Sequence, residues 1–156
     1  MSDALAPPPI HRSSFLVHHL IHAIWLGSGA FILLSASAIF RAAGTPSVAA
    51  DVVGAMLARW HYIALLAPVL LLVLGWRHAR GRVVALLFTA VVLASLQVVT
   101  DVQIRAIRML SPIPISSRLH SDPLRRRFGL LHGISSILLI AQVLAAAAVT
   151  DSWNRT

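Results

Sequence analysis

The sequence predicts an all-α integral membrane protein, a four-helix up-down bundle. The first observation is that four long runs, each near or above the 18 apolar residues typical of a membrane-spanning helix, carry no Asp, Glu, Lys or Arg. The second is the composition, 58% hydrophobic and only 12% charged over 156 residues, which is far from a soluble average. The third is that the charged residues fall mainly in the gaps between these runs, as expected for loops at the membrane surface.

The residue types that are missing exclude several kinds of chemistry. The chain has no lysine, so it has neither a lysine Schiff base nor a P-loop lysine. It has no cysteine, which excludes disulfides, iron–sulfur clusters, thiolate zinc sites and covalently attached c-type haem. The net charge is +8, but the arginines flank apolar runs. We therefore expect anionic lipid headgroups as their partners, and no nucleic acid.

The chain divides into a tail, a four-span domain and a second tail. Residues 1–13 contain Pro7-Pro8-Pro9 and are expected to be extended. The domain covers residues 14–150, with spans at about 14–40, 55–76, 83–108 and 128–150, and residues 151–156 form a short C-terminal tail. The first span is roughly twice as long as a signal-peptide core of about 7–15 residues, which predicts an uncleaved helix.

The first two spans have recognisable ends. Gly44-Thr45-Pro46 ends the first span, and Asp51 is the expected start of the second helix, with Ser47 as the alternative. Pro68 near the middle of the second span predicts a kink. Aromatic residues at both ends of this span are typical of a membrane-interface belt: Trp60, Tyr62 and Trp76.

The third and fourth spans read as helices as well. The run from Val83 to Thr100 is too long for a strand, and an isolated strand cannot pair its backbone in lipid. We expect this helix to continue toward Met109, before Pro112 and Pro114. The fourth span carries Gly129-x-x-x-Gly133, a pattern that favours close helix packing.

Arginine counts predict the orientation. Four spans put both termini on one side, which carries five arginines against eight on the other. The positive-inside rule then places the termini outside a plasma membrane, the bacterial inner membrane. Without Arg105 and Arg108, which belong to the third helix, the count is five against six.

Histidines near the start of the first span form one candidate site. His18 and His22 lie one helical turn apart, the spacing of two metal ligands on one face. His22 alone is also suited to ligate a haem held within the bundle. The alternative is that His18 and His19 lie at headgroup depth and bind water or phosphate. Because Trp25 shares its face, we expect His22 to point into the bundle and contact a polar group, a metal or a haem.

A second candidate site lies near the opposite membrane surface. His61 and His132, on different helices at similar depth, would suit bis-histidine ligation of a haem; alternatively both are interfacial. Gln97, Asp101 and Arg105 form an i, i+4, i+8 stripe on the third helix. This stripe is either a structural Asp101–Arg105 ion pair or part of a proton or ion relay that includes His132.

Several short motifs resemble a known group of membrane proteins. The pattern His22-x-x-Trp25-Leu26-Gly27, followed by Phe40-Arg41, resembles the first span of CopD-like four-helix proteins. That group includes copper-resistance D proteins, the HemJ type of protoporphyrinogen oxidase and a domain of unknown function shared with a transmembrane family tied to platinum-drug resistance. Arg127-Phe128-Gly129-x-x-His132-Gly133-x-Ser135 looks most like this last domain. A HemJ-like function would imply that His22 ligates haem b together with a lysine, which this chain lacks, whereas a CopD-like function would imply copper handling by imidazole.

These patterns together predict a role inside the membrane. We expect a non-catalytic or accessory subunit of a larger membrane complex, with the lipid bilayer and other membrane subunits as partners and an intramembrane histidine ligating haem or pigment. One alternative is a redox protein that binds haem b or a transition metal. Another is a transporter of copper or another metal ion.

Overall fold

The predicted all-α fold is confirmed by the computed structural model, which describes residues 10–76, 79 and 81–155. Four long helices account for most of these residues: α1 (Ile10–Ala42), α2 (Pro46–Gly75), α3 (Gly81–Met109) and α4 (Pro123–Asn154). A single turn of 3₁₀ helix, η1 (Ile115–Ser117), lies in the connection between α3 and α4.

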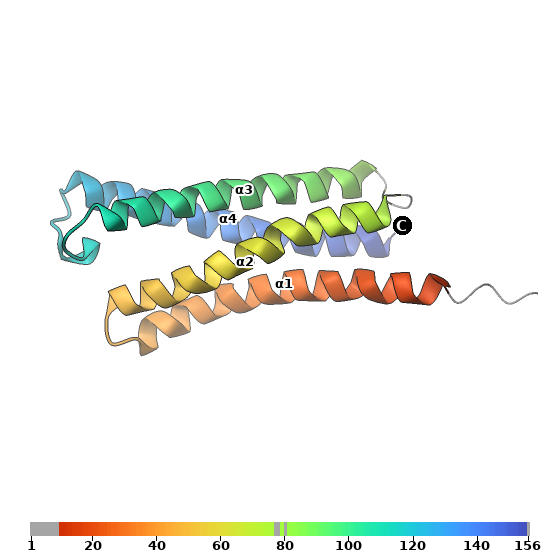
Figure 1. Cartoon of the computed structure of the whole chain (residues 1–156), viewed down its shortest axis with the longest axis horizontal. Helices are drawn as coiled ribbons and strands as arrows, with labels where there is room; N and C mark the ends of the chain where they lie inside the picture. Colours follow the sequence, from red (N-terminus) through yellow and green to blue (C-terminus); the bar gives the residue numbers. More distant parts are fainter. Residues whose placement is uncertain (1–9, 77–78, 80, 156) are drawn as a thin grey trace, which may run out of the picture.

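The helices run antiparallel in chain order, so α1 begins and α4 ends at the same end of the bundle (Figure 1). We call this the terminal end, and the end with the α1–α2 and α3–α4 connections the loop end. In Figure 1, α2 lies beside α1 at the loop end and then approaches α3 toward the terminal end.

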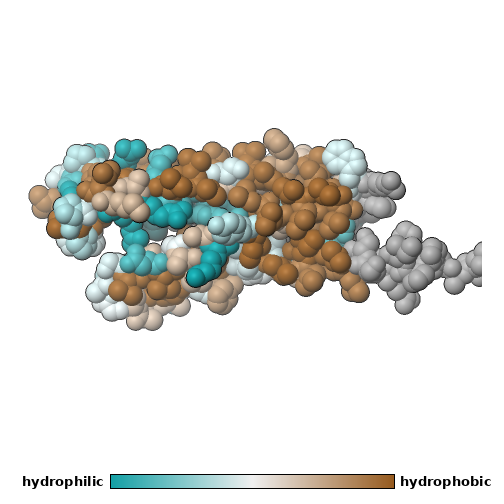
Figure 2. Space-filling view, viewed as in Figure 1, coloured by the Kyte–Doolittle hydropathy of each residue, from teal (hydrophilic) through white to brown (hydrophobic). Residues whose placement is uncertain are grey.

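All four helices are long and apolar enough to cross a membrane. Their candidate spans of 27 to 31 residues exceed the roughly 20 residues that cross a hydrocarbon core of about 30 Å, so the helices reach beyond it. Figure 2 shows where the excess lies: brown apolar side chains cover the terminal half of this face, and teal hydrophilic side chains gather toward the loop end. A lipid bilayer is therefore the environment that this surface fits.

Two helix starts are set by capping groups. The helix α2 begins at Pro46, five residues before the expected Asp51, because Thr45 Oγ1 accepts a hydrogen bond from the Val48 N–H at 3.4 Å. A proline suits the first helical position, which needs no N–H donor. In the same way Asp122 caps α4, where its carboxylate accepts from the Leu124 N–H at 2.8 Å.

The helices extend into both segments that we expected to be tails. Helix α1 begins at Ile10, inside the segment expected to be extended, and residues 1–9 lie outside the described part of the chain. Helix α4 continues past residue 150 to Asn154, where Asp151 accepts a hydrogen bond from Arg155 at 2.9 Å, the i, i+4 arrangement that supports a helix end. Helix α3 ends at Met109, as predicted.

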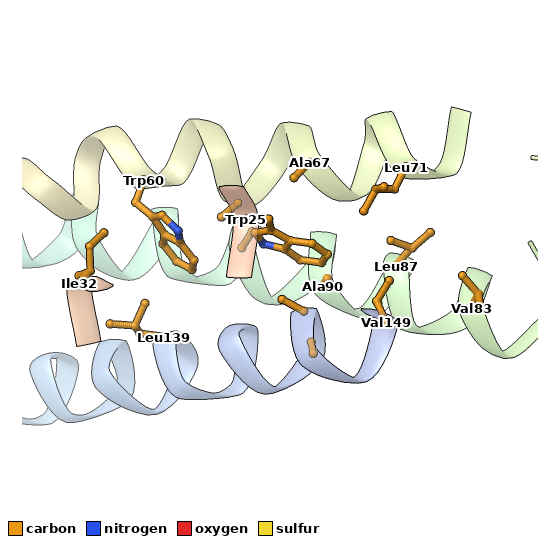
Figure 3. Close-up of a cluster of buried hydrophobic side chains, with 14 residues drawn as sticks. Trp25, Ile32, Trp60, Ala67, Leu71, Val83, Leu87, Ala90, Leu139 and Val149 are labelled. Atoms are coloured by element: carbon orange, nitrogen blue, oxygen red, sulfur yellow. The ribbon is translucent and has the colours of Figure 1, made fainter. Parts of the chain in front are cut away.

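Two indole rings fill the centre of the bundle among small side chains. Trp25 and Trp60 are both almost fully buried, and Figure 3 shows their rings between side chains of α2, α3 and α4. Gly29 makes this packing possible, because a Cβ there would lie 3.0 Å from both Trp60 Cζ2 and Val143 Cγ2. The close packing expected at Gly129 and Gly133 is absent from the described structure: an added Cβ would meet nothing within 4 Å at either position.

Candidate functional site

Three polar side chains from three helices meet inside the bundle toward the loop end. His61 on α2 is buried, and its Nε2 lies 3.0 Å from Asp101 Oδ2 on α3. The other carboxylate oxygen accepts a hydrogen bond from the Ser135 hydroxyl on α4 at 2.9 Å. An imidazole, a carboxylate and a hydroxyl are thus held within reach of one another, and all three are groups that exchange protons.

Two glutamines extend this cluster along the interior of the bundle, toward the terminal end. Gln97 on α3 is fully buried; its amide donates to Ser135 Oγ at 2.9 Å, and its carbonyl accepts from Gln142 Nε2 at 2.8 Å. Each bond therefore donates in the same direction, from Gln142 through Gln97 and Ser135 to the Asp101 carboxylate. Hydrogen bonds in such a chain polarise one another in a low-dielectric interior.

A separate polar contact lies near the terminal end. The His22 Nδ1 lies 3.1 Å from the Thr150 hydroxyl, which itself donates to the Ala146 carbonyl at 2.9 Å. Because the hydroxyl proton points to Ala146, the bond to His22 requires a proton on Nδ1. The neutral ring then carries its lone pair on Nε2, a buried atom without a hydrogen-bond partner among the described residues.

Further polar atoms without a partner lie between and beside these two groups. In the described part of the chain, Trp25 Nε1, Gln142 Oε1 and Ser152 Oγ are buried and make no hydrogen bond. Ser135, Gln142 and Ser152 all lie on α4, and the 17 residues from the first to the last correspond to about 25 Å of helix. Bonded and unbonded polar atoms are therefore spread along α4 over a length close to the thickness of a hydrocarbon core, about 30 Å. We call these side chains the polar column: His22, Trp25, His61, Gln97, Asp101, Ser135, Gln142, Thr150 and Ser152.

The three histidines of the first span lie in different environments. His18 is buried beside Trp153, with ring centroids 4.8 Å apart, and His22 meets the same indole edge-on at 5.9 Å. His19 is exposed. Among the described residues no group of three or more His or Asp side chains is placed to hold a metal, so His18 and His22 have no third ligand there.

The structure does not bring His61 and His132 together in the interior. His132 is exposed on α4 and stacks on Phe128 with ring centroids 6.2 Å apart, whereas His61 is buried. The described residues therefore do not form the bis-histidine pair expected at His61 and His132. Neither His132 nor Arg105 belongs to the polar column.

Arg105 does not make the contact with the Asp101 carboxylate that the sequence predicts. Its guanidinium is exposed and its Nε donates to the backbone carbonyl of Asp101 at 3.4 Å, while the Asp101 carboxylate faces His61 and Ser135. The carboxylate is turned into the bundle, and the long arginine side chain reaches outward. The predicted Asp101–Arg105 ion pair is therefore wrong for the described structure.

Four members of the polar column were not expected as site residues from the sequence: Ser135, Gln142, Thr150 and Ser152. Ser135, Gln142 and Thr150 lie in the uncharged run of the fourth span, where neutral polar residues are common helix contacts. The available signal was spacing: Ser135 and Gln142 are seven residues apart, which places both on one helix face.

In comparisons with known proteins, no protein family, curated protein or solved structure matches this chain.

Proposed function

We propose that this membrane protein relays protons through its bundle, between the His61–Asp101 pair toward the loop end and His22 near the terminal end. The observation that carries the proposal is the polar column, whose hydrogen-bonded part runs from Gln142 to Asp101, with His61 Nε2 3.0 Å from the Asp101 carboxylate. Buried polar groups in a membrane interior are costly, and ionisable ones there commonly mark ion or proton pathways.

The groups of the polar column have different roles in this proposal. Imidazole and carboxylate groups can accept and donate a proton, so His61, Asp101 and His22 are the proton-binding groups. A glutamine amide holds its protons tightly, so Gln97 and Gln142 serve to orient hydrogen bonds. Water is the carrier between them.

Water would have suitable partners between Gln142 and His22. A buried water makes about three hydrogen bonds to polar groups that otherwise lack a partner. Gln142 Oε1 and His22 Nε2 accept, and Trp25 Nε1 donates; all three are buried and unpaired among the described residues. Their depths follow one another along the bundle, so water bound to them would continue the bonded chain to the terminal end.

Proton flux into liposomes tests the relay. The full chain is reconstituted with a pH-sensitive dye inside the vesicles, and a pH step is applied together with a potassium ionophore. We expect Asp101→Asn to lower the flux at least about tenfold, since a positioned proton-transfer group commonly contributes about 10²–10⁴-fold. Arg105→Gln is the matched control, because Arg105 is exposed and bonds only to a backbone carbonyl. A wild-type flux equal to that of empty vesicles, or an unchanged flux in Asp101→Asn, would refute the relay.

A second candidate function is that of an accessory subunit that holds a haem or pigment of a larger membrane complex through His22. Two observations favour it. The Thr150 contact orients the imidazole and leaves Nε2 unpaired, and metal-bound histidines are commonly oriented in this way by a bond to the other ring nitrogen. Gly129 and Gly133 face outward with open space above them, where a helix of another subunit would fit closely.

Co-purification from the native membrane tests this second candidate. A tagged chain should carry further subunits and a Soret band, and His22→Ala should remove the band. Gly129→Leu should release the partner subunits without unfolding the bundle, because the added Cβ would meet no other helix within 4 Å in the described part of the chain. A chain that purifies alone and colourless from its native membrane contradicts the accessory role.

The arginine counts support an orientation with both termini outside a plasma membrane, which reporter fusions at each end would test.

A further inference from the structure

A groove on the outside of the bundle lies where α1 and α2 meet. Its volume is about 230 Å³, and apolar side chains form most of its lining. Phe31 and Ile32 contribute from α1, Met56 and Ile63 contribute from α2, and the buried Trp60 ring is also part of the lining. One charged side chain, Arg59, lines the same groove.

Arg59 lies at a depth along α2 where lipid hydrocarbon would leave its guanidinium without hydrogen-bond partners. Gly75 lies at the level of Trp153 near the terminal end, and the 16 residues from Gly75 back to Arg59 correspond to about 24 Å of helix. Counted from the level of Gly75, a hydrocarbon core of about 30 Å would extend about 6 Å past the Arg59 backbone toward the loop end. Side chains on a helix lean toward its N-terminus, which for α2 is the loop end, so the guanidinium points toward the headgroups.

Arg59 has no counter-ion among the described residues. Every aspartate that the structure describes already has a basic partner on another residue: Asp51 with Arg108, Asp101 with His61, Asp122 with Arg118 and Asp151 with Arg155. Arg59 itself makes no hydrogen bond or ion pair in the described part of the chain. An arginine at this depth is stabilised by an anion that reaches it from the membrane surface.

We propose that this groove binds one anionic phospholipid, with the headgroup phosphate on Arg59 and an acyl chain along Phe31, Ile32 and Ile63. The guanidinium matches a phosphate because it offers two parallel N–H donors. Ile63 lies one turn deeper than Arg59 along α2, so a chain that descends from the phosphate meets the apolar lining. An anionic phospholipid fits this site because one molecule carries both a phosphate for the Arg59 cation and an acyl chain for the apolar groove.

Native mass spectrometry of the detergent-solubilised full chain tests this binding. The chain is titrated with phosphatidylglycerol, with phosphatidylcholine and with soluble glycerol phosphate. We expect one phosphatidylglycerol to bind with preference over phosphatidylcholine, and glycerol phosphate not to compete, since it lacks the acyl chain. Arg59→Gln should weaken phosphatidylglycerol binding roughly fivefold, because one arginine near the surface contributes about that factor. Arg59→Lys should retain part of the preference.

The matched control is Arg105→Gln, an exposed arginine on α3 outside the groove lining. Filling the groove provides a second variant, Ile63→Trp, which should lower binding of both lipids while the charge of Arg59 remains. Equal loss in Arg59→Gln and Arg105→Gln would overturn the proposal, since it would indicate attraction by net charge alone. Equal affinity for the two phospholipids, or full competition by glycerol phosphate, would also overturn it. Circular dichroism serves as the control that each variant in the comparison is folded.

Discussion

Replacing the central glutamines tests the interior of the bundle quantitatively. Gln97→Leu removes two hydrogen bonds, one to Ser135 and one from Gln142, and leaves the size of the side chain nearly unchanged. Side-chain hydrogen bonds between membrane helices contribute on average about 0.6 kcal/mol and up to about 1.7 kcal/mol each. We therefore expect Gln97→Leu to lower the free energy of unfolding by about 1–3 kcal/mol.

The double-mutant cycle with Gln142→Leu isolates the bond between the two amides. Gln142→Leu alone leaves the Gln97 carbonyl buried without its donor, whereas the double variant removes both groups. The double variant should thus be more stable than the sum of the two single losses predicts, by about 0.6–1.7 kcal/mol. Unfolding in lipid bicelles, followed by steric trapping, measures each free energy. A coupling energy of zero would show that the two amides do not meet, and the bonded part of the polar column would then be wrong.

Two further changes test the packing at the terminal end and the start of α4. Gly75→Ala should destabilise the chain by about 1–3 kcal/mol, because the added Cβ would overlap Trp153 and lie 2.8 Å from its Cζ2. Gly27→Ala, with nothing within 4 Å, should be neutral or stabilising in the same unfolding assay, and equal losses at both glycines would contradict this packing. The hydrogen bond from Arg118 lowers the pKa of Asp122 below its ordinary value of 3.8, so the carboxylate stabilises the fold above pH 3.8 and this contribution is lost as the pH falls through the lowered pKa. Hydrogen exchange in the first turn of α4 should therefore quicken in acid, and Asp122→Asn, which keeps a capping side chain, should remove this pH dependence; an unchanged acid response would argue against the contact.

The helices followed from the sequence because long uncharged runs have few structures open to them in lipid. A chain in a bilayer must pair its backbone internally, so length and hydropathy together indicate helix for each run. The exact starts depended on single capping contacts. Thr45 and Pro46 provided a better helix start than Asp51. The sequence pattern had placed Thr45 and Pro46 in the turn that ends the first span.

The site was predicted less completely, because spacing within one helix cannot show what faces it across the bundle. The i, i+4 rule paired Asp101 with Arg105, whereas the carboxylate meets His61 and Ser135 on other helices. His22 was expected to point inward from its shared face with Trp25, and it contacts Thr150, more than a hundred residues away along the chain. The Gly129 pattern predicted close helix packing, and this is wrong among the described helices, which leave that face open.

Water contact at the Trp25 indole tests the central claim, a hydrated polar column, most directly. The chain is labelled with ¹⁵N-tryptophan in lipid bilayers, and magnetisation transfer from water to each indole N–H is recorded by solid-state NMR, with Trp25→Phe to assign the signal. The exposed Trp76 provides the positive control, and Trp60, whose Nε1 donates to Ser28 at 3.2 Å, provides a bonded reference. We predict rapid transfer to the Trp25 N–H although the residue is 1% exposed, because the proposed relay requires water bound between Trp25, Gln142 and His22. A Trp25 signal that receives no magnetisation from water and stays protected in D₂O, while Trp76 exchanges, would contradict the relay.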